Sequence, residues 1–146
     1  MFNRLRQRST DEGGFTLIEL LVVILIIGIL AAIAIPAFLS QTGKASDSAA
    51  KTQVGTLQTT IETYANENNG DFSKATLPEL QKIEPTLKDT STAVAKPLAG
   101  LSTTSFEVES EAVGTKDKYK LKSVGGEVTR TCAPAGKGGC TASGSW

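Results

Sequence analysis

The side chains that most often do chemistry in proteins are scarce in this sequence. Its 146 residues include no histidine, the commonest general base and metal ligand, and two cysteines are too few for a cysteine-based zinc site. It contains no glycine-rich phosphate-binding loop and no nucleophile motif. The 15 basic residues balance 15 acidic ones, so no basic excess favours nucleic-acid binding. We therefore expect no enzyme activity, cofactor, metal or specific nucleic-acid partner.

One carboxylate stands in an unusual place. Glu19 is the single charged residue between Phe15 and Leu39. Together with Thr16 it has the spacing of a capping box, in which two side chains satisfy free backbone amides at a helix start. A carboxylate within a membrane span costs up to a few kcal/mol, and less near the end of the span. A local cap therefore accounts for Glu19, and a cationic partner would do so too.

The apolar segment 20–39 must position this carboxylate. Its twenty uncharged residues are enough to span a bilayer, and fourteen of them are Leu, Ile, Val or Phe. Their insertion is favourable by about 4 to 8 kcal/mol. Arg4, Arg6 and Arg8 precede the segment, so the positive-inside rule predicts a cytoplasmic N-terminus and export of the remainder.

Three interpretations of this segment compete. The first is a secretory signal cut after Ala32-Ile33-Ala34, and the second is a permanent signal anchor. The third starts from Gly13-Gly14, which offers a protease an extended segment without side chains just before Phe15.

The third interpretation agrees with a family resemblance. The run GGFTLIELLVVILIIGILAAIAIPAF resembles the N-terminus of bacterial type IV pilins, and the likeness covers about the first fifty residues. The resemblance implies cleavage between Gly14 and Phe15 by a prepilin peptidase, N-methylation of Phe15 and retention of the apolar helix. It also implies that Glu19 pairs with the Phe15 amine of a neighbouring subunit, and the local cap can coexist with that pairing.

A single long helix is predicted over residues 15–67, about 80 Å at 1.5 Å per residue. Its second half places apolar residues on one face at a 4-3-4-3 spacing: Ala50, Val54, Leu57, Ile61 and Tyr64. No small domain can bury such a length, so the first half must lie in lipid or against other copies. Gly28 and Pro36 weaken that half. The resemblance implies that the segment between them loses helical structure in a filament, and a simple kink is the alternative.

The remaining residues are expected to form a small head completed by the helix. A short helix is signalled by residues 76–79, with Leu77, Leu80 and Ile83 on its buried side. Residues 85–100 are predicted to be a surface loop. Three antiparallel strands should follow, the third covering 127–132 and ending at Cys132.

The first two strands carry glutamates and lysines in alternation with apolar residues. A four-residue loop at 112–115 would pair Glu111 with Lys116, and a register shifted by two residues also pairs the charges but needs a six-residue loop. We expect the shorter loop. The lysines should form a solvated sheet face rather than a binding patch. In the third strand Val128 and Cys132 face inward, and Arg130 falls on that side at an edge where it reaches water.

Cys132 and Cys140 are most simply a disulfide in an exported chain, worth about 2–3 kcal/mol by the chain-entropy argument. Redox catalysis is disfavoured because the spacing is not C-x-x-C. The ring of Trp146 should lie on the sheet, with an exposed adhesive role as the alternative.

Together these features predict an α+β type IV pilin fold, a long N-terminal helix packed on a small antiparallel sheet. Four segments follow: a cleaved leader (1–14), the hydrophobic transmembrane and assembly half of the helix (15–39), its amphipathic half (40–68) and a head (69–146). The expected function is a homo-oligomeric filament subunit for adhesion, twitching motility or DNA uptake. Its partners would be a prepilin peptidase/methylase, pilus assembly machinery and membrane lipid, and its location the inner or cytoplasmic membrane and then an extracellular pilus. The alternatives are a pseudopilin of a type II secretion or competence system, and a secreted binding protein.

Overall fold

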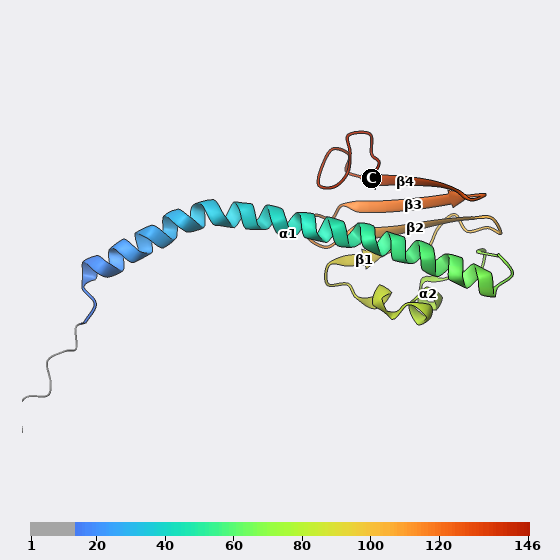
Figure 1. The fold of residues 1–146 in the computed structure, drawn as a ribbon, viewed down its shortest axis with the longest axis horizontal. Helices are drawn as coiled ribbons and strands as arrows, with labels where there is room; N and C mark the ends of the chain where they lie inside the picture. Colours follow the sequence, from blue (N-terminus) through green and yellow to red (C-terminus); the bar gives the residue numbers. More distant parts are fainter. Residues whose placement is uncertain (1–13) are drawn as a thin grey trace, which may run out of the picture. The chain divides into compact units, whose positions relative to one another are not determined.

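The computed structural model describes residues 14–146, so the predicted roles of Arg4, Arg6 and Arg8 lie outside the described residues. The chain divides into two compact units, one ending at Phe38 and the other beginning at Leu39. Helix α1 (Leu17–Glu67) contributes residues to both. It begins two residues later than predicted and ends where predicted, before the turn that contains Gly70 (Figure 1).

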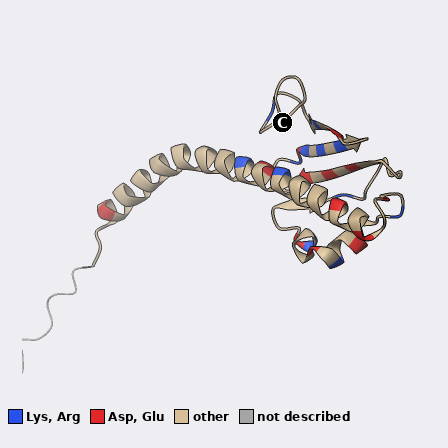
Figure 2. Cartoon of the chain, turned by 45° about the vertical axis from the view of Figure 1, so that its right-hand side comes forward, with Lys and Arg blue, Asp and Glu red and all other residues tan. Residues whose placement is uncertain are grey.

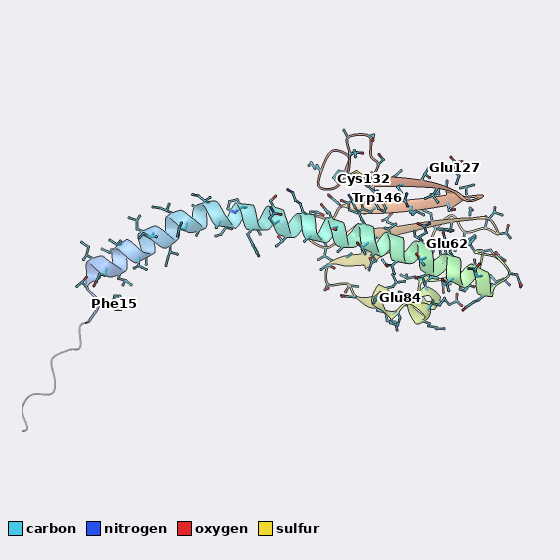
Figure 3. All side chains as sticks on the ribbon, viewed as in Figure 1. Phe15, Glu62, Glu84, Glu127, Cys132 and Trp146 are labelled. Carbon is cyan, nitrogen blue, oxygen red and sulfur yellow. A yellow bond between two sulfur atoms is a disulfide. The ribbon has the colours of Figure 1, made fainter. Side chains whose placement is uncertain are left out.

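The first unit consists of the apolar half of α1. It is helical from Leu17 onward. The large apolar side chains from Phe15 to Leu39 are all exposed, from 46 % at Val23 to 86 % at Phe15. Figure 3 shows side chains leaving this part of the helix in all directions. Within the described residues, α1 is the one helix long and apolar enough to cross a membrane, with a mean hydropathy of 3.1 over its most apolar 18 residues.

The second unit is built on a four-stranded antiparallel sheet, in the order β1 (Ala93–Ala95), β2 (Ser105–Ala112), β3 (Lys118–Val124) and β4 (Glu127–Ala133). The prediction of three strands was therefore wrong, because β1 lies in the segment expected to be a loop. Strand β1 has three residues, too few for an alternating pattern to be visible in the sequence. It pairs with the last residues of β2, Ala93 opposite Ala112.

The predicted register between β2 and β3 was also wrong. Glu111 lies opposite Lys118, Glu109 opposite Lys120 and Glu107 opposite Lys122. This is the alternative register shifted by two residues, with a six-residue connection over 112–117 in place of the four-residue loop. The connection is held by its own backbone, since the amide of Ala112 donates to the carbonyl of Asp117 at 2.8 Å and its carbonyl accepts from Lys116.

The core lies between the sheet and the amphipathic half of α1. The predicted stripe is confirmed, because Ala50, Val54, Leu57 and Ile61 are fully buried and Tyr64 is partly buried. From the sheet they meet inward side chains of β2 and β3: Phe106, Val108, Ala112, Tyr119 and Leu121.

Two short helices cover another side of the core. Helix α2 (Leu77–Ile83) buries Leu80 and partly buries Leu77, but Ile83 is 37 % exposed, so its predicted burial was wrong. The chain leaves α2 at Glu84 and enters the 3-10 helix η1 (Pro85–Lys88), which buries Leu87 instead. Residues 85–100 thus contain both η1 and β1, where a surface loop was expected.

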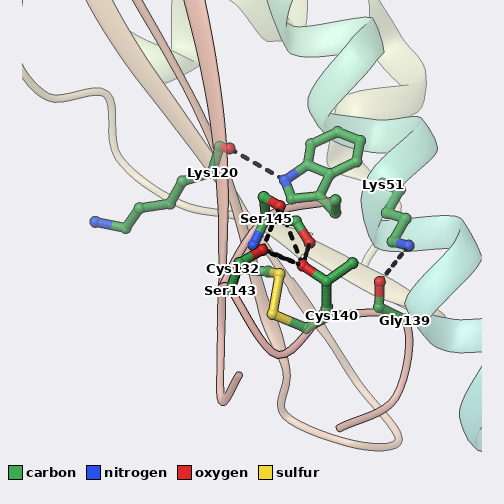
Figure 4. The surroundings of a disulfide bond; sticks show 9 residues. Lys51, Lys120, Cys132, Gly139, Cys140, Ser143 and Ser145 are labelled. Carbon is green, nitrogen blue, oxygen red and sulfur yellow. Dashed lines mark hydrogen bonds between the residues drawn. A yellow bond between two sulfur atoms is a disulfide. The ribbon is translucent and has the colours of Figure 1, made fainter. Parts of the chain in front are cut away.

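The end of the chain folds back on the sheet. The predicted disulfide joins Cys132 of β4 to Cys140, with their Cα atoms 5.6 Å apart (Figure 4). The indole of Trp146 donates to the carbonyl of Lys120 at 3.2 Å and meets the Tyr119 ring edge-on. The ring therefore lies on the sheet, as predicted. Arg130 is exposed at the edge strand, and its guanidinium stacks over the same indole at 5.6 Å.

Candidate functional site

The first turn of α1 brings Thr16 and Glu19 together as a reciprocal capping box. The carboxylate oxygen Glu19 Oε2 accepts from the Thr16 amide at 2.9 Å and from its hydroxyl at 2.7 Å. In return the Thr16 hydroxyl accepts from the Glu19 amide at 3.2 Å. Local capping of the helix by Glu19 is thus present in the single chain.

One oxygen of that carboxylate is left over. Both bonds from Thr16 end on Oε2, and within the described residues Glu19 Oε1 accepts no hydrogen bond. The side chain can therefore cap its own helix and still accept from a cation on another molecule.

The proposed cleavage position lies directly before this turn. Gly14 and Phe15 precede the helix, and Phe15 is 86 % exposed. An open, non-helical segment is the form a protease needs, since it must reach the backbone on both sides of the bond. Gly14, Phe15 and Glu19 therefore lie within one short stretch at the start of α1.

The apolar half of α1 is an unpartnered surface in the single chain. The sequence explains why no part of the chain covers this surface: the apolar residues surround the helix and do not form one stripe. A helix that is apolar all round is buried in a protein core or in a membrane. An exposed apolar surface of this extent marks a site of contact with membrane or protein. Here the relevant chemistry is packing rather than catalysis.

The helix is continuous through both predicted break points. Gly28 and Pro36 lie within α1, and nothing approaches within 4 Å of the position that a Cβ would take at Gly28. The loss of helical structure between them was expected for the packed filament, so it remains a prediction about the assembly.

The outer face of the sheet carries paired charges (Figure 2). Lys120 lies between Glu107 at 3.0 Å and Glu109 at 3.1 Å, and Lys96 meets Glu111 at 3.0 Å. Hydrogen bonding to Lys96 lowers the pKa of Glu111, and hydrogen bonds to Glu107 and Glu109 raise the pKa of Lys120. Lys120, in the middle of β3, is thus neutralised by two glutamates of β2, as expected for a solvated face.

The sequence reading missed a buried polar cluster beneath the disulfide loop. Asp47 is 2 % exposed and Asp117 is 5 % exposed. A signal for Asp47 was available, because it lies three residues before Ala50 and so extends the 4-3-4-3 apolar stripe by one step. A carboxylate on the buried face of a helix needs a partner. Within the described residues there is no group of three or more His, Cys, Asp or Glu suited to a metal.

Comparison with known proteins identifies the N-terminal segment. Residues 10–35 match the model of a prokaryotic N-terminal methylation motif. The type IV major pilin protein PilA of Myxococcus xanthus is 48 % identical over 72 residues, which is 48 % of this chain and 33 % of the relative. A fimbrial protein of Pseudomonas aeruginosa is 43 % identical over 70 residues, 48 % of this chain and 46 % of the relative.

A more distant likeness points to a secretion system. The type II secretion system core protein G of Pseudomonas aeruginosa is 37 % identical over 58 residues, 40 % of this chain and 41 % of the relative. No solved structure matches the chain. The aligned part of the chain spans between a third and a half of the length of these relatives. The resemblance seen in the sequence is thereby confirmed for the N-terminal segment, and each of these relatives aligns with less than half of the chain.

Proposed function

We propose that this chain is a structural subunit that polymerises into a type IV pilus. Its N-terminus resembles that of the precursors of type IV pilins. The observation that carries the proposal is the apolar half of α1, whose large apolar side chains are exposed on all sides of the helix and take no part in the core of the head. Each copy would bury this half against the same segment of its neighbours. The hydrophobic effect then drives assembly, and the heads cover the resulting core.

Before assembly the same segment would lie in a membrane. A prepilin peptidase would cut between Gly14 and Phe15, and methylation of the new amine would follow. The segment is long enough to span the hydrocarbon layer, so the subunit would be held there until assembly machinery withdraws it. Its head would lie outside, where a disulfide between Cys132 and Cys140 persists.

Glu19 would set the register between neighbouring subunits. Inside a packed apolar core an unpaired carboxylate is costly, and a cation brought against it removes that cost. The Phe15 amine of the adjacent copy supplies the cation, and the free Oε1 of Glu19 supports this role because the local cap occupies Oε2 alone. The pairing therefore favours one axial position of the incoming subunit.

The sequence identity to this chain is higher for the pilin and fimbrial relatives, at 48 % and 43 %, than for the secretion protein, at 37 %. We therefore prefer a pilus over the short pseudopilus of a type II secretion or competence system. Surface attachment, twitching motility and DNA uptake are the roles such a filament would serve. Electron microscopy of the cell surface separates the two assemblies, since long fibres are expected of a pilus and not of a pseudopilus.

The experiment is to compare Glu19→Ala with Glu62→Ala, a matched change at an exposed glutamate later in the same helix. Glu19→Ala should still be cleaved, giving a mature N-terminus at methylated Phe15, yet should form few filaments by electron microscopy. Glu62→Ala should form normal filaments. Normal filaments from Glu19→Ala would refute the pairing, and a mature N-terminus at Ile35 would instead indicate a protein released by signal peptidase.

A further inference from the structure

Two buried carboxyl groups lie where the disulfide loop (132–140) meets α1. Asp47 belongs to α1 and is 2 % exposed, whereas Asp117 ends the connection between β2 and β3 and is 5 % exposed. A Cβ added at Gly138, in the loop, would come within 3.0 Å of both Asp47 Oδ2 and Asp117 Oδ2. The two oxygens therefore converge on one position beneath the disulfide loop.

Asp47 has hydrogen-bond donors that suit its charged form. Its Oδ1 accepts from the Thr115 hydroxyl of the connection, although no donor lies within 3.5 Å of Oδ2 in bonding geometry. The phenol of Tyr119, on β3, keeps its proton because burial first, and then the charge of Asp47, raises its pKa. A phenol has a single proton to give. Even where that proton turns toward Asp47, Asp117 is left without a donor.

Asp117 has no comparable support. Among the described residues its side chain accepts no hydrogen bond and has no ion pair within 4.0 Å. Lys51 does not reach it, because Lys51 Nζ donates to the carbonyl of Gly139 at 2.7 Å and lies 5.2 Å from the centre of the Tyr119 ring (Figure 4). Burial first, and then the charge of Asp47, raises the pKa of Asp117, and the opposing effect of Lys137 in the loop is smaller.

One proton would satisfy both carboxyl groups. A protonated carboxyl has an O–H donor, whereas an ionised carboxylate can only accept. Two carboxylates that share a buried site repel each other, so one of them holds a proton more tightly than it would in water. Asp117 is the better holder, because Asp47 already has the Thr115 hydroxyl for its charged form.

We infer that Asp47 and Asp117 share one proton, carried by the Asp117 carboxyl and directed at Asp47 Oδ2, and that this proton holds the disulfide loop and the β2–β3 connection against α1. Without it two like charges face each other beneath Gly138, and their repulsion loosens the loop from the helix. The pair is thus a pH-sensitive contact in the head, tight in acid and weakened as the pH rises.

The direction of the pH effect follows from Asp117. Its ordinary pKa is 3.8, and the value in the folded chain is higher. The folded head therefore binds this proton more tightly than the unfolded chain does. The resulting stabilisation is fully present below pH 3.8 and is lost as the pH rises through the folded pKa. This sign is opposite to that of Glu111, whose pKa is lowered in the fold.

The first test is thermal unfolding of the full chain in neutral detergent micelles at pH 4 and pH 8, followed by the fluorescence of Trp146, the single tryptophan. Asp117→Asn keeps the shape of the protonated carboxyl and is neutral at both pH values. It should unfold at the same temperature as the unmodified chain at pH 4 and at a higher temperature at pH 8. Glu127→Gln, at an exposed glutamate of β4, is the matched control and should follow the unmodified chain at both.

The second test reads the proton directly, from the carboxyl ¹³C chemical shift of Asp117 as the pH is changed. We expect a midpoint above 3.8 in the unmodified chain and one closer to 3.8 in Asp47→Asn, which removes the neighbouring charge. A midpoint at or below 3.8 in the unmodified chain, or one that Asp47→Asn leaves unchanged, would overturn the inference. So would an Asp117→Asn chain that at pH 8 unfolds no higher than the unmodified chain, since the charged carboxylate would then not weaken the head.

Discussion

The division of α1 into a packing half and a head-supporting half can be tested with one substitution in each. Leu57 is fully buried in the head core, whereas Leu25 is 62 % exposed in the apolar half. Leu57→Ala removes three buried carbon groups, each worth about 0.8 kcal/mol on transfer from water. A cavity penalty is added because the surroundings relax only in part, which brings the expected loss to about 2–5 kcal/mol.

For a unit the size of residues 39–146 this loss lowers the melting temperature of the head by about 8–20 °C, at roughly 4 °C per kcal/mol. Leu25→Ala makes the same chemical change in the same helix and should leave that temperature unchanged. It should instead reduce the yield of filaments, because it removes apolar surface from the packing half. The measurement is thermal unfolding of the full chain in micelles, followed by the fluorescence of Trp146 in the head.

Two results would refute this reasoning. One is a loss below about 1 kcal/mol for Leu57→Ala, which would mean that the stripe does not complete the head core. The other is an equal loss of head stability from Leu25→Ala, which would mean that the two halves do not act as separate units.

Three further predictions concern the head. Reduction and alkylation of Cys132 and Cys140, which are eight residues apart, should lower the free energy of unfolding by about 2.5 kcal/mol in urea, and an unchanged value would contradict the chain-entropy account. Gly55→Ala should raise it by about 0.5–1 kcal/mol in the same assay, because Gly55 is within α1 and nothing lies within 4 Å of the added Cβ. The pKa of Glu111 is lowered by Lys96 in the folded state, so this stabilisation is present above the ordinary value of 4.5 and is lost as the pH falls through the lower folded value. Urea unfolding from pH 7 to pH 3 should show a shallower acid loss for Glu111→Gln than for the unmodified chain.

Sequence patterns predicted most of the elements because those elements are long or strongly periodic. The stripe through Val54, Leu57 and Ile61 repeats over several turns, so its burial follows from helical geometry alone. Likewise the alternation around Phe106 and Tyr119 is clear enough to reveal two strands with one buried face.

The features that escaped prediction depend on contacts distant in sequence. Strand β1 exists because Ala93 finds a partner in Ala112, and three residues give no periodic signal of their own. Ile83 has the right spacing for burial, yet the chain turns at Glu84 and places Leu87 in the core. The meeting of Asp47 with Asp117 was missed for the same reason, since the two buried aspartates are 70 positions apart along the chain.

The register of β2 and β3 shows why charge patterns alone could not decide it. Glutamates and lysines alternate with a period of two, so a shift of two residues exchanges partners while every side chain keeps its face. The choice must then come from the connection, and here the longer one reaches α1: Thr115 donates to Asp47, and a Cβ at Gly114 would lie 2.8 Å from the Ser46 hydroxyl. The same register places Ser110, fully buried, where its hydroxyl donates to Gln53 at 2.6 Å. Docking of this connection on the helix therefore selects one of two registers that the strands themselves would accept.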